Sequence, residues 1–429
     1  KTVRNIPDLT AGRRGRPPYE EYYVNRTDQP QVSVLWIKLI YVAVYSSYGA
    51  TSVYLSLFYR RIGLTDSQIG FLIALQPLVM LIAGPLWSII GDRLGLRARL
   101  LALVTGFSIV PMLAMGLTTN FWLVTLYTAL YALFNGPIQP LTDSMALTAL
   151  GDQRHKYGVI RAFGSLGYAP VMWIVGLIIQ GRDIRWIFVV NALFMGAACL
   201  LTLRTRVEQR ALQGSIASGL GTLLRNHMWR VFMIAVFIAM ALQTVSFSYF
   251  GLYMDTLNAS EGLIGFSGAL GSGSQVLLLI GILPWMLRSW GSQRLMLIGF
   301  AGFAVRFALW AFIPSPWVVT ASQLLQGLTF GAALLASVDF AAQYAPEGMA
   351  ATSQAIVTSL VAGLGRSFGG ILCGGLYDGI GPQGTFGVFT VMAIAGCPQS
   401  WARFTISFTS DTPSISLIFV WQCSSTRLI

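Results

Sequence analysis

The stretch 140–168 reads PLTDSMALTALGDQRHKYGVIRAFGSLGY and places one acid and one base inside otherwise apolar segments. Asp143 and Arg161 lie at equal distances on either side of Asp152, so a helical hairpin that turns over 151–156 brings them to similar depth. A charge inside a bilayer helix costs roughly 2.5–3.5 kcal/mol, and such residues face a bundle interior or an aqueous cavity. Two interpretations stay open: a structural ion pair between two helices, or a site that contacts a solute or a coupling ion.

The composition predicts an all-α protein that crosses a membrane many times. Of the 429 residues, 55% are hydrophobic and only 10% are charged, whereas soluble domains average about 25% charged residues. The net charge of +12 would fit nucleic-acid binding in a soluble domain. Here the basic residues fall between apolar spans, where they set the orientation of the chain. We therefore expect a lipid bilayer as partner and no nucleic acid.

Catalytic and metal-binding patterns are missing from the sequence. The four Cys residues form no CxxC pair, and two His residues are too few for a metal cluster with them. No nucleophile–base triad or phosphate-binding loop is found, and the Gly-rich run 268–273 lies inside an apolar span, which is typical of helix packing. We therefore predict no disulfide, no metal, no cofactor and no enzymatic activity.

The apolar segments divide into two sets of six predicted helices, and all but one are long enough to cross about 30 Å of hydrocarbon. The predicted spans are 32–58, 69–90, 100–117, 121–150, 159–179 and 187–203, then 231–252, 264–287, 295–312, 317–344, 353–377 and 386–395. The last of them is too short to cross alone. The expected domains are a cytoplasmic basic tail (1–31), a first bundle (32–203), a cytoplasmic linker (204–230), a second bundle (231–396) and an atypical C-terminal segment (397–429). That final segment is polar, and we interpret it as a truncated or misjoined end of the chain. We therefore expect the twelfth helix to be incomplete.

The basic residues also predict the orientation. Loops on one side carry the Lys and Arg residues of the tail, of 93–99, of 154–156 and of the linker, while the other side has only Arg60, Arg61, Arg182 and Arg185. Because Lys and Arg favour the cytoplasmic side, the N-terminus and the linker are predicted to be cytoplasmic. The plasma membrane is the expected location, with an organelle membrane as the alternative.

The loop Gly91-Asp92-Arg93-Leu94-Gly95-Leu96-Arg97 resembles the cytoplasmic motif GxxxDRxGR[RK] of the major facilitator superfamily. This resemblance implies two six-helix bundles that rock about a central site. A carboxylate at a helix end can engage a neighbouring helix N-terminus or an Arg and release it as the halves move. Asp92 and Arg93 would then latch one gate, with Gly95 allowing a tight turn. The alternative is a basic loop that only sets topology.

The segment 156–168, KYGVIRAFGSLGY, is similar to the fifth helix of lactose permease and nucleoside–proton symporters, whose pattern is FGRxRxFGxxGW. The same pattern occurs in the eukaryotic "major facilitator superfamily associated domain" proteins. This resemblance implies that Arg161 binds solute hydroxyls, that Asp143 accepts hydrogen bonds and pairs with Arg161, and that Tyr168 offers a stacking face. Tyr168 could equally be a packing or interface aromatic residue.

Coupling to protons is less well supported by the sequence. Arg306 matches an Arg that serves proton release in lactose permease, but Gln326 and Thr329 stand where that permease has His and Glu. Neither Gln nor Thr titrates near neutral pH. Asp339, Asp143 or Asp255 could carry a proton instead, or be structural, and Arg306 could be a packing or snorkelling residue. Proton symport and uniport both stay open.

These observations predict a secondary-active or facilitative transporter of a small polar organic solute, sugar-like or nucleoside-like, that works by alternating access as a monomer. The competing hypothesis is a transport-inactive receptor or scaffold on the same fold, favoured by the missing coupling acids and the atypical C-terminal segment. An integral membrane enzyme ranks third.

Overall fold

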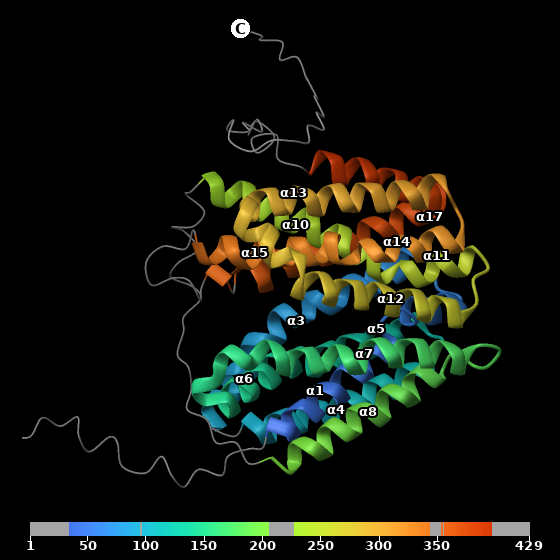
Figure 1. Ribbon diagram of the computed structural model, residues 1–429. Helices are drawn as coiled ribbons and strands as arrows, with labels where there is room; N and C mark the ends of the chain where they lie inside the picture. Colours follow the sequence, from blue (N-terminus) through green and yellow to red (C-terminus); the bar gives the residue numbers. More distant parts are fainter. Residues whose placement is uncertain (1–33, 95–96, 206–226, 344–352, 355, 397–429) are drawn as a thin grey trace, which may run out of the picture.

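The computed structural model describes residues 34–94, 97–205, 227–343, 353–354 and 356–396, and these residues form helices without strands. The predicted basic tail (1–31), residues 206–226 of the linker and the segment 397–429 lie outside the described residues (Figure 1). Nine described stretches are long and apolar enough to cross a membrane. Many large apolar side chains face outward, among them Leu117, Leu277 and Phe312, as expected for surfaces that contact lipid. The predicted all-α membrane class is confirmed.

The first half of the chain forms one group of helices. It contains α1 (Val34–Thr51), α2 (Leu55–Arg61), α3 (Asp66–Leu94), α4 (Arg97–Gly116), α5 (Phe121–Asn135), α6 (Ile138–Leu150), α7 (Tyr157–Ile179) and α8 (Trp186–Leu203). The predicted span 32–58 is interrupted after Thr51, where the chain turns before α2 begins at Leu55. The predicted hairpin turn over 151–156 is a short 3-10 helix between α6 and α7.

The second half forms a similar group. It contains α10 (His227–Ser248), α11 (Phe250–Thr256), α12 (Glu261–Ile280), α13 (Ile282–Phe312), α14 (Pro316–Ser322), α15 (Ala332–Gln343) and α17 (Ala362–Ala395), with π-helical turns at Gly327–Gly331 and Ile356–Val361. Gly291 and Gly381 have positive φ angles and break α13 and α17 into two segments each. Glycine tolerates this left-handed backbone without a steric penalty.

The helix starts follow from local capping. Thr65 and Gln68 form a reciprocal capping box, in which the Gln68 backbone N–H donates to Thr65 Oγ1 at 3.3 Å and the Thr65 N–H donates to Gln68 Oε1 at 3.0 Å. Ser260 accepts a hydrogen bond from the Leu263 N–H at 3.3 Å and so caps α12. Both helix starts therefore depend on residues that lie within three positions of each other in the chain.

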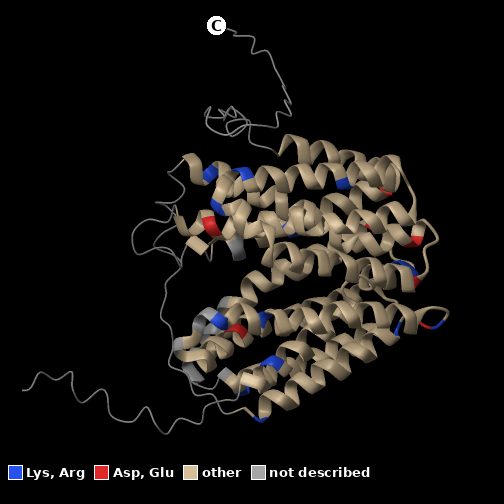
Figure 2. Ribbon diagram, in the orientation of Figure 1, with Lys and Arg blue, Asp and Glu red and all other residues tan. Residues whose placement is uncertain are grey.

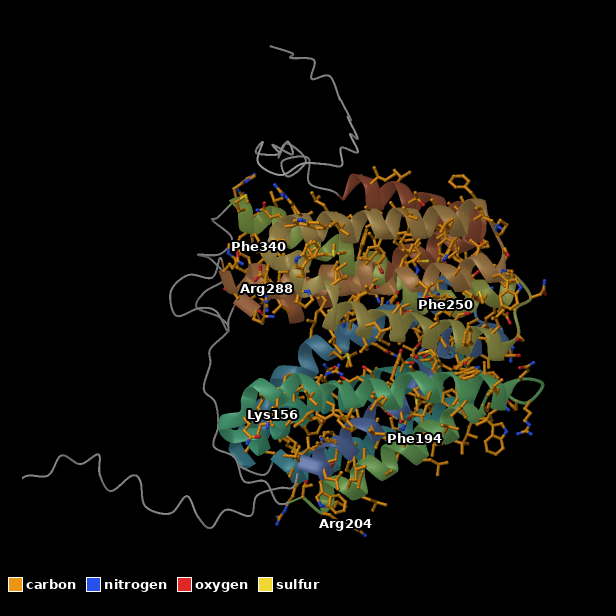
Figure 3. All side chains as sticks on the ribbon, viewed as in Figure 1. Lys156, Phe194, Arg204, Phe250, Arg288 and Phe340 are labelled. Carbon is orange, nitrogen blue, oxygen red and sulfur yellow. The ribbon has the colours of Figure 1, made fainter. Side chains whose placement is uncertain are left out.

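The two groups lie one above the other, and each packs internally (Figure 1). They meet where α3 packs on α17 and α7 packs on α12. Side chains such as Phe250 and Phe340 (Figure 3) fill the core of the second group. The Phe340 ring is stacked on that of Phe232, with 3.7 Å between the ring centres. Charged residues gather mainly at the two ends of the helices (Figure 2). We call these the Gly63 end, which carries the turns at Gly63 and Gly181, and the Gly151 end, which carries the turn between α6 and α7.

Candidate functional site

A cavity of about 500 Å³ lies between the two groups of helices. Both groups contribute to its wall, since α1, α3 and α7 face α10, α12, α13 and α17 across it. The polar lining residues include Tyr45, Gln76, Asn135, Arg161 and Tyr168 from the first group, and Gln243, Gln275, Arg306, Gln323, Gln326 and Arg366 from the second. A pocket of this size, shared by two groups of helices, is the expected place for a small organic ligand.

Arg161 and Tyr168 both line this cavity from α7, as their assignment to a solute site requires. The Arg161 guanidinium lies 4.2 Å from the centre of the Tyr45 ring, a cation–π contact. The Tyr168 hydroxyl donates to Ser52 Oγ at 3.0 Å. Gly167 lets α7 approach α1 closely, because a Cβ atom there would lie 2.4 Å from the carbonyl oxygen of Val42. Two of the three predicted solute-binding residues are therefore brought together.

Asp143 is not a lining residue of the cavity, and its partner differs from the expected one. The Tyr41 hydroxyl donates to Asp143 Oδ1 at 2.5 Å, and the Tyr41 ring lies 6.0 Å from the Arg161 guanidinium. Among the described residues no ion pair joins Asp143 to Arg161. The expected direct pair is thus absent from this conformation, because Tyr41 supplies a hydroxyl donor to the acid and an aromatic face to the base.

The predicted gating motif is only partly described. Gly91 is buried in α3. Gly95 lies outside the described residues, as do the side chains of Asp92, Arg93 and Arg97. The latch assigned to this motif stays a prediction.

Two of the three candidate coupling residues meet in the second group. Arg306 is 1% exposed, and its two terminal nitrogens donate to the amide oxygens of Gln326 and Gln323. Its guanidinium also lies 5.1 Å from the centre of the Trp310 ring. Asp339 lies elsewhere, on α15, where it accepts a hydrogen bond from Gln343 at 2.8 Å. The only side chains that accept hydrogen bonds from Arg306 in the described structure are therefore neutral.

Two cavity residues, Arg366 and Gln323, were not predicted from the sequence. Arg366 lines the cavity from α17, and Gln323 contacts Arg306 from the segment before α15. An Arg inside the apolar span 353–377 was a usable signal, because charges in such spans are rare and face cavities. The π-helical turn at Gly327–Gly331 follows Gln326 directly, and such turns often occur at functional sites.

Opposite charges join the two groups at the Gly63 end. Arg61 Nη2 lies 2.6 Å from Glu261 Oε1 and 3.7 Å from Asp255 Oδ1, so α2 is tied to the start of α12. Within the first group, Arg60 Nη2 lies 2.5 Å from Asp66 Oδ1. These ion pairs hold the loops of this end together.

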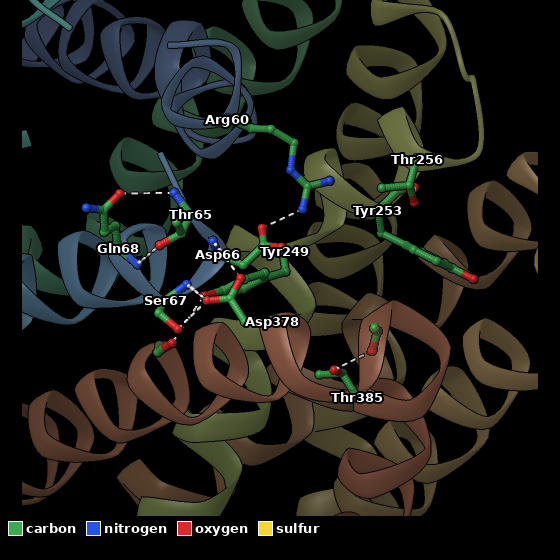
Figure 4. Close-up of polar contacts among 12 residues, drawn as sticks. Arg60, Thr65, Asp66, Ser67, Gln68, Tyr249, Tyr253, Thr256, Asp378 and Thr385 are labelled. Carbon is green, nitrogen blue, oxygen red and sulfur yellow. Dashed lines mark hydrogen bonds and ion pairs between the residues drawn. The ribbon is translucent and has the colours of Figure 1, made fainter. Parts of the chain in front are cut away.

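Asp378 of α17 caps the N-terminus of α3, as Figure 4 shows. Its carboxylate accepts hydrogen bonds from the backbone N–H groups of Asp66 at 3.1 Å and Ser67 at 2.8 Å, and from the Ser67 hydroxyl. Partial burial raises the pKa of Asp378, but these hydrogen bonds and the positive charge of Arg60 outweigh it and lower the pKa below its ordinary value. The ionised form is therefore the one that closes this contact between the groups.

Close backbone contact also joins the groups at this end. A Cβ atom on Gly70 of α3 would lie 2.5 Å from the carbonyl oxygen of Gly370 and 2.9 Å from Gly374 Cα, both on α17. The Tyr249 hydroxyl donates to that same Gly370 oxygen at 3.1 Å. The Gly63 end of the interface is thus packed too tightly to admit a side chain between α3 and α17.

Comparisons with known proteins agree with this architecture. The family model described as "MFS_1 like family" matches residues 34–388. The chain is 27% identical over 370 residues to the maltose permease of Geobacillus stearothermophilus, covering 83% of this chain and 91% of that protein. It is 25% identical over 386 residues to a probable 3-phenylpropionic acid transporter of Escherichia coli, covering 86% and 97%. The crystal structure of the nucleoside transporter NupG superposes with a TM-score of 0.76 at 18% identity, covering 87% of this chain and all of that one.

Proposed function

The chain belongs to the MFS_1-like family of the major facilitator superfamily, and on this basis we propose that it carries a small polar organic solute across a membrane by alternating access. The observation that carries the proposal is the cavity of about 500 Å³ that both groups of helices line. Relatives named as a maltose permease and a nucleoside transporter favour a sugar-like or nucleoside-like solute.

The proposed solute site is centred on Arg161 and Tyr168. An Arg fork can donate parallel hydrogen bonds to neighbouring oxygens, and an aromatic ring can pack on the apolar face of a sugar or base. Both side chains reach the cavity from one helix, α7. Asp143 acts through Tyr41, which contacts both Asp143 and Arg161, so we assign it a positioning role.

The proposed transport cycle exchanges contacts at the two ends of the molecule. The ion pairs of Arg61 and the cap from Asp378 join the groups at the Gly63 end. If the N-terminus is cytoplasmic, as the distribution of basic residues predicts, this conformation is closed on the non-cytoplasmic side. Movement to the opposite state breaks these contacts, and the motif around Asp92 and Arg93 then latches the cytoplasmic side.

Facilitated transport without an ion gradient is the simpler form of this cycle. No Asp or Glu lines the cavity within the described residues, and Arg306 donates to the amides of Gln323 and Gln326 instead of an acid. The same observation favours the alternative function, a transport-inactive receptor or scaffold. Proton symport would have to use Asp143, Asp255 or Asp339, none of which lines the cavity.

Uptake into liposomes tests the proposal. The full chain is reconstituted, and the entry of radiolabelled maltose, glucose and uridine is followed with and without a proton gradient. We expect at least one solute to equilibrate faster than in empty liposomes. A solute that binds but never crosses would favour the receptor.

The Arg161→Ala variant tests the site itself. We expect solute binding to fall by at least tenfold, about 1.4 kcal/mol, while membrane insertion is unchanged. Arg182→Ala is the matched control, because Arg182 is exposed at the Gly63 end and does not line the cavity. Unchanged binding in Arg161→Ala, measured by titration of the purified protein, would remove Arg161 from the site.

A further inference from the structure

The described wall of the cavity carries positive charge without negative charge. Arg161, Arg306 and Arg366 line it, and no Asp or Glu does. The described acids are engaged elsewhere: Asp66, Asp255, Glu261 and Asp378 at the Gly63 end, Asp143 with Tyr41, Asp183 with Arg185, and Asp339 with Gln343. A neutral sugar requires no such excess of guanidinium groups.

Arg306 is a buried cation that has no counter-charge among the described residues. It is 1% exposed, and the two side chains that accept its hydrogen bonds, Gln323 and Gln326, are neutral amides. A guanidinium stays protonated in proteins, and a buried charge without a counter-charge is costly to the fold. The buried Nε of Arg306 and Nε2 of Gln323 have no hydrogen-bond partner, and both are donors. This part of the wall therefore has positive charge and unpaired donors for which the described side chains supply no anionic acceptor.

Arg366 adds a second cation to this side of the cavity. It lies on α17, which packs against α13, the helix that carries Arg306. Its side chain is exposed to the cavity, and it takes part in no ion pair among the described residues. In a carrier, a cation that lines the cavity without a counter-charge is placed to contact the solute.

We propose that the solute is a small organic anion whose carboxylate or phosphate binds at the wall formed by Arg306, Arg366 and Gln323. The organic body of the solute then lies against Arg161, Tyr45 and Tyr168 of the first group. This inference rests on the proposed transport function and narrows its substrate class. The charge-assisted hydrogen bonds between guanidinium and anion are stronger than those to a neutral hydroxyl.

Matched pairs of compounds that differ by one acidic group test the inference. The full chain is reconstituted in phosphatidylcholine bilayers, so that no anionic lipid headgroup competes for the wall. The probes are glucose with glucuronate, 3-phenylpropanol with 3-phenylpropionate, and uridine with uridine 5′-monophosphate. Binding is measured by the shift in Tm and by titration, and entry by uptake. We expect at least one acid to bind at least tenfold more tightly than its neutral partner.

Variants of Arg366 and Arg306 test whether these residues cause the tighter binding of the acid. Arg366→Gln is expected to weaken binding of the acid at least tenfold and to weaken binding of its neutral partner less, so that the preference for the acid falls. Arg306→Gln should act in the same direction, and because this buried position could affect folding, Arg306→Lys should restore part of the preference by keeping the charge. Arg294→Gln is the matched control, since Arg294 is exposed on α13, the helix that carries Arg306, and does not line the cavity.

The outcomes separate this inference from the proposed function. If a neutral compound binds or enters as well as its acid, and Arg366→Gln changes neither, the anion assignment is wrong and the carrier stands. The assignment also fails if no acid binds while a neutral compound is transported. If none of the six compounds binds or enters, the anion assignment and the proposed carrier are both rejected.

Discussion

At the scale of single residues, Tyr41 decides how the membrane-embedded acid and base are arranged. Its hydroxyl donates to Asp143, and its ring lies beside the guanidinium of Arg161. Tyr45, whose ring is stacked 6.1 Å from that of Tyr41, makes the closer contact with Arg161. An aromatic pair thus stabilises both charges where the sequence alone indicated a direct ion pair.

The Tyr41→Phe variant tests the contacts of Tyr41 with Asp143 and Arg161. The change removes only the hydroxyl, so Asp143 loses a hydrogen bond worth about 1.5–3 kcal/mol for a charged group, while the aromatic ring stays beside Arg161. We expect a lower Tm of the purified protein together with a loss of solute affinity smaller than that of Arg161→Ala. Equal losses of affinity in the two variants would show that Tyr41 touches the solute directly.

At the scale of helices, α3 and α17 pack backbone against backbone between the two groups. Gly70 faces Gly370 and Gly374 there, and Asp378 caps the first turn of α3. These contacts all belong to the Gly63 end. We therefore expect the balance between the two transport states to be sensitive to side-chain volume at Gly70.

The variants Gly70→Ala and Gly84→Ala provide a matched comparison on one helix. A Cβ atom at Gly70 would lie 2.5 Å from the Gly370 oxygen, whereas nothing lies within 4 Å of a Cβ atom at Gly84. Gly70→Ala should open the Gly63 end, while Gly84→Ala should leave it closed. Spin labels at Arg182→Cys and Trp317→Cys, with the native cysteines replaced, would report the separation of the groups. Identical distance distributions in both variants would contradict the proposed tight contact.

At the scale of the whole molecule, two groups of helices enclose one cavity and touch each other through α3 with α17 and α7 with α12. Alternating access requires these contacts to open and close while each group keeps its own packing. The ion pair between Arg61 and Glu261 at 2.6 Å spans the groups at the Gly63 end. A covalent link at this place should therefore stop the cycle.

Cross-linking tests this requirement. A bismaleimide linking Arg61→Cys to Glu261→Cys, in a chain without other cysteines, should reduce uptake by at least tenfold. Solute binding in detergent should persist, because the link lies outside the cavity lining. The unlinked double variant is the control for the loss of the ion pair. Unreduced uptake after complete cross-linking would argue against rocking of the two groups.

The sequence by itself determined the membrane class, most of the spans, the hairpin turn over 151–156, the capping box at the start of α3 and the Ser260 cap at the start of α12. Each of these depends on composition or on residues close together in the chain. The family resemblance placed Arg161 and Tyr168 in the site, and both line the cavity.

Only the tertiary structure decided which side chains share the cavity. The amount of apolar surface tells where a helix crosses the membrane, but not which face it turns toward a helix from the other half of the chain. Arg366 and Gln323 reach the cavity and Asp143 does not, because interhelical packing sets the rotation of α17 and α6 and the path of the segment before α15. The positive wall is for this reason a property of the folded molecule and not of any one segment.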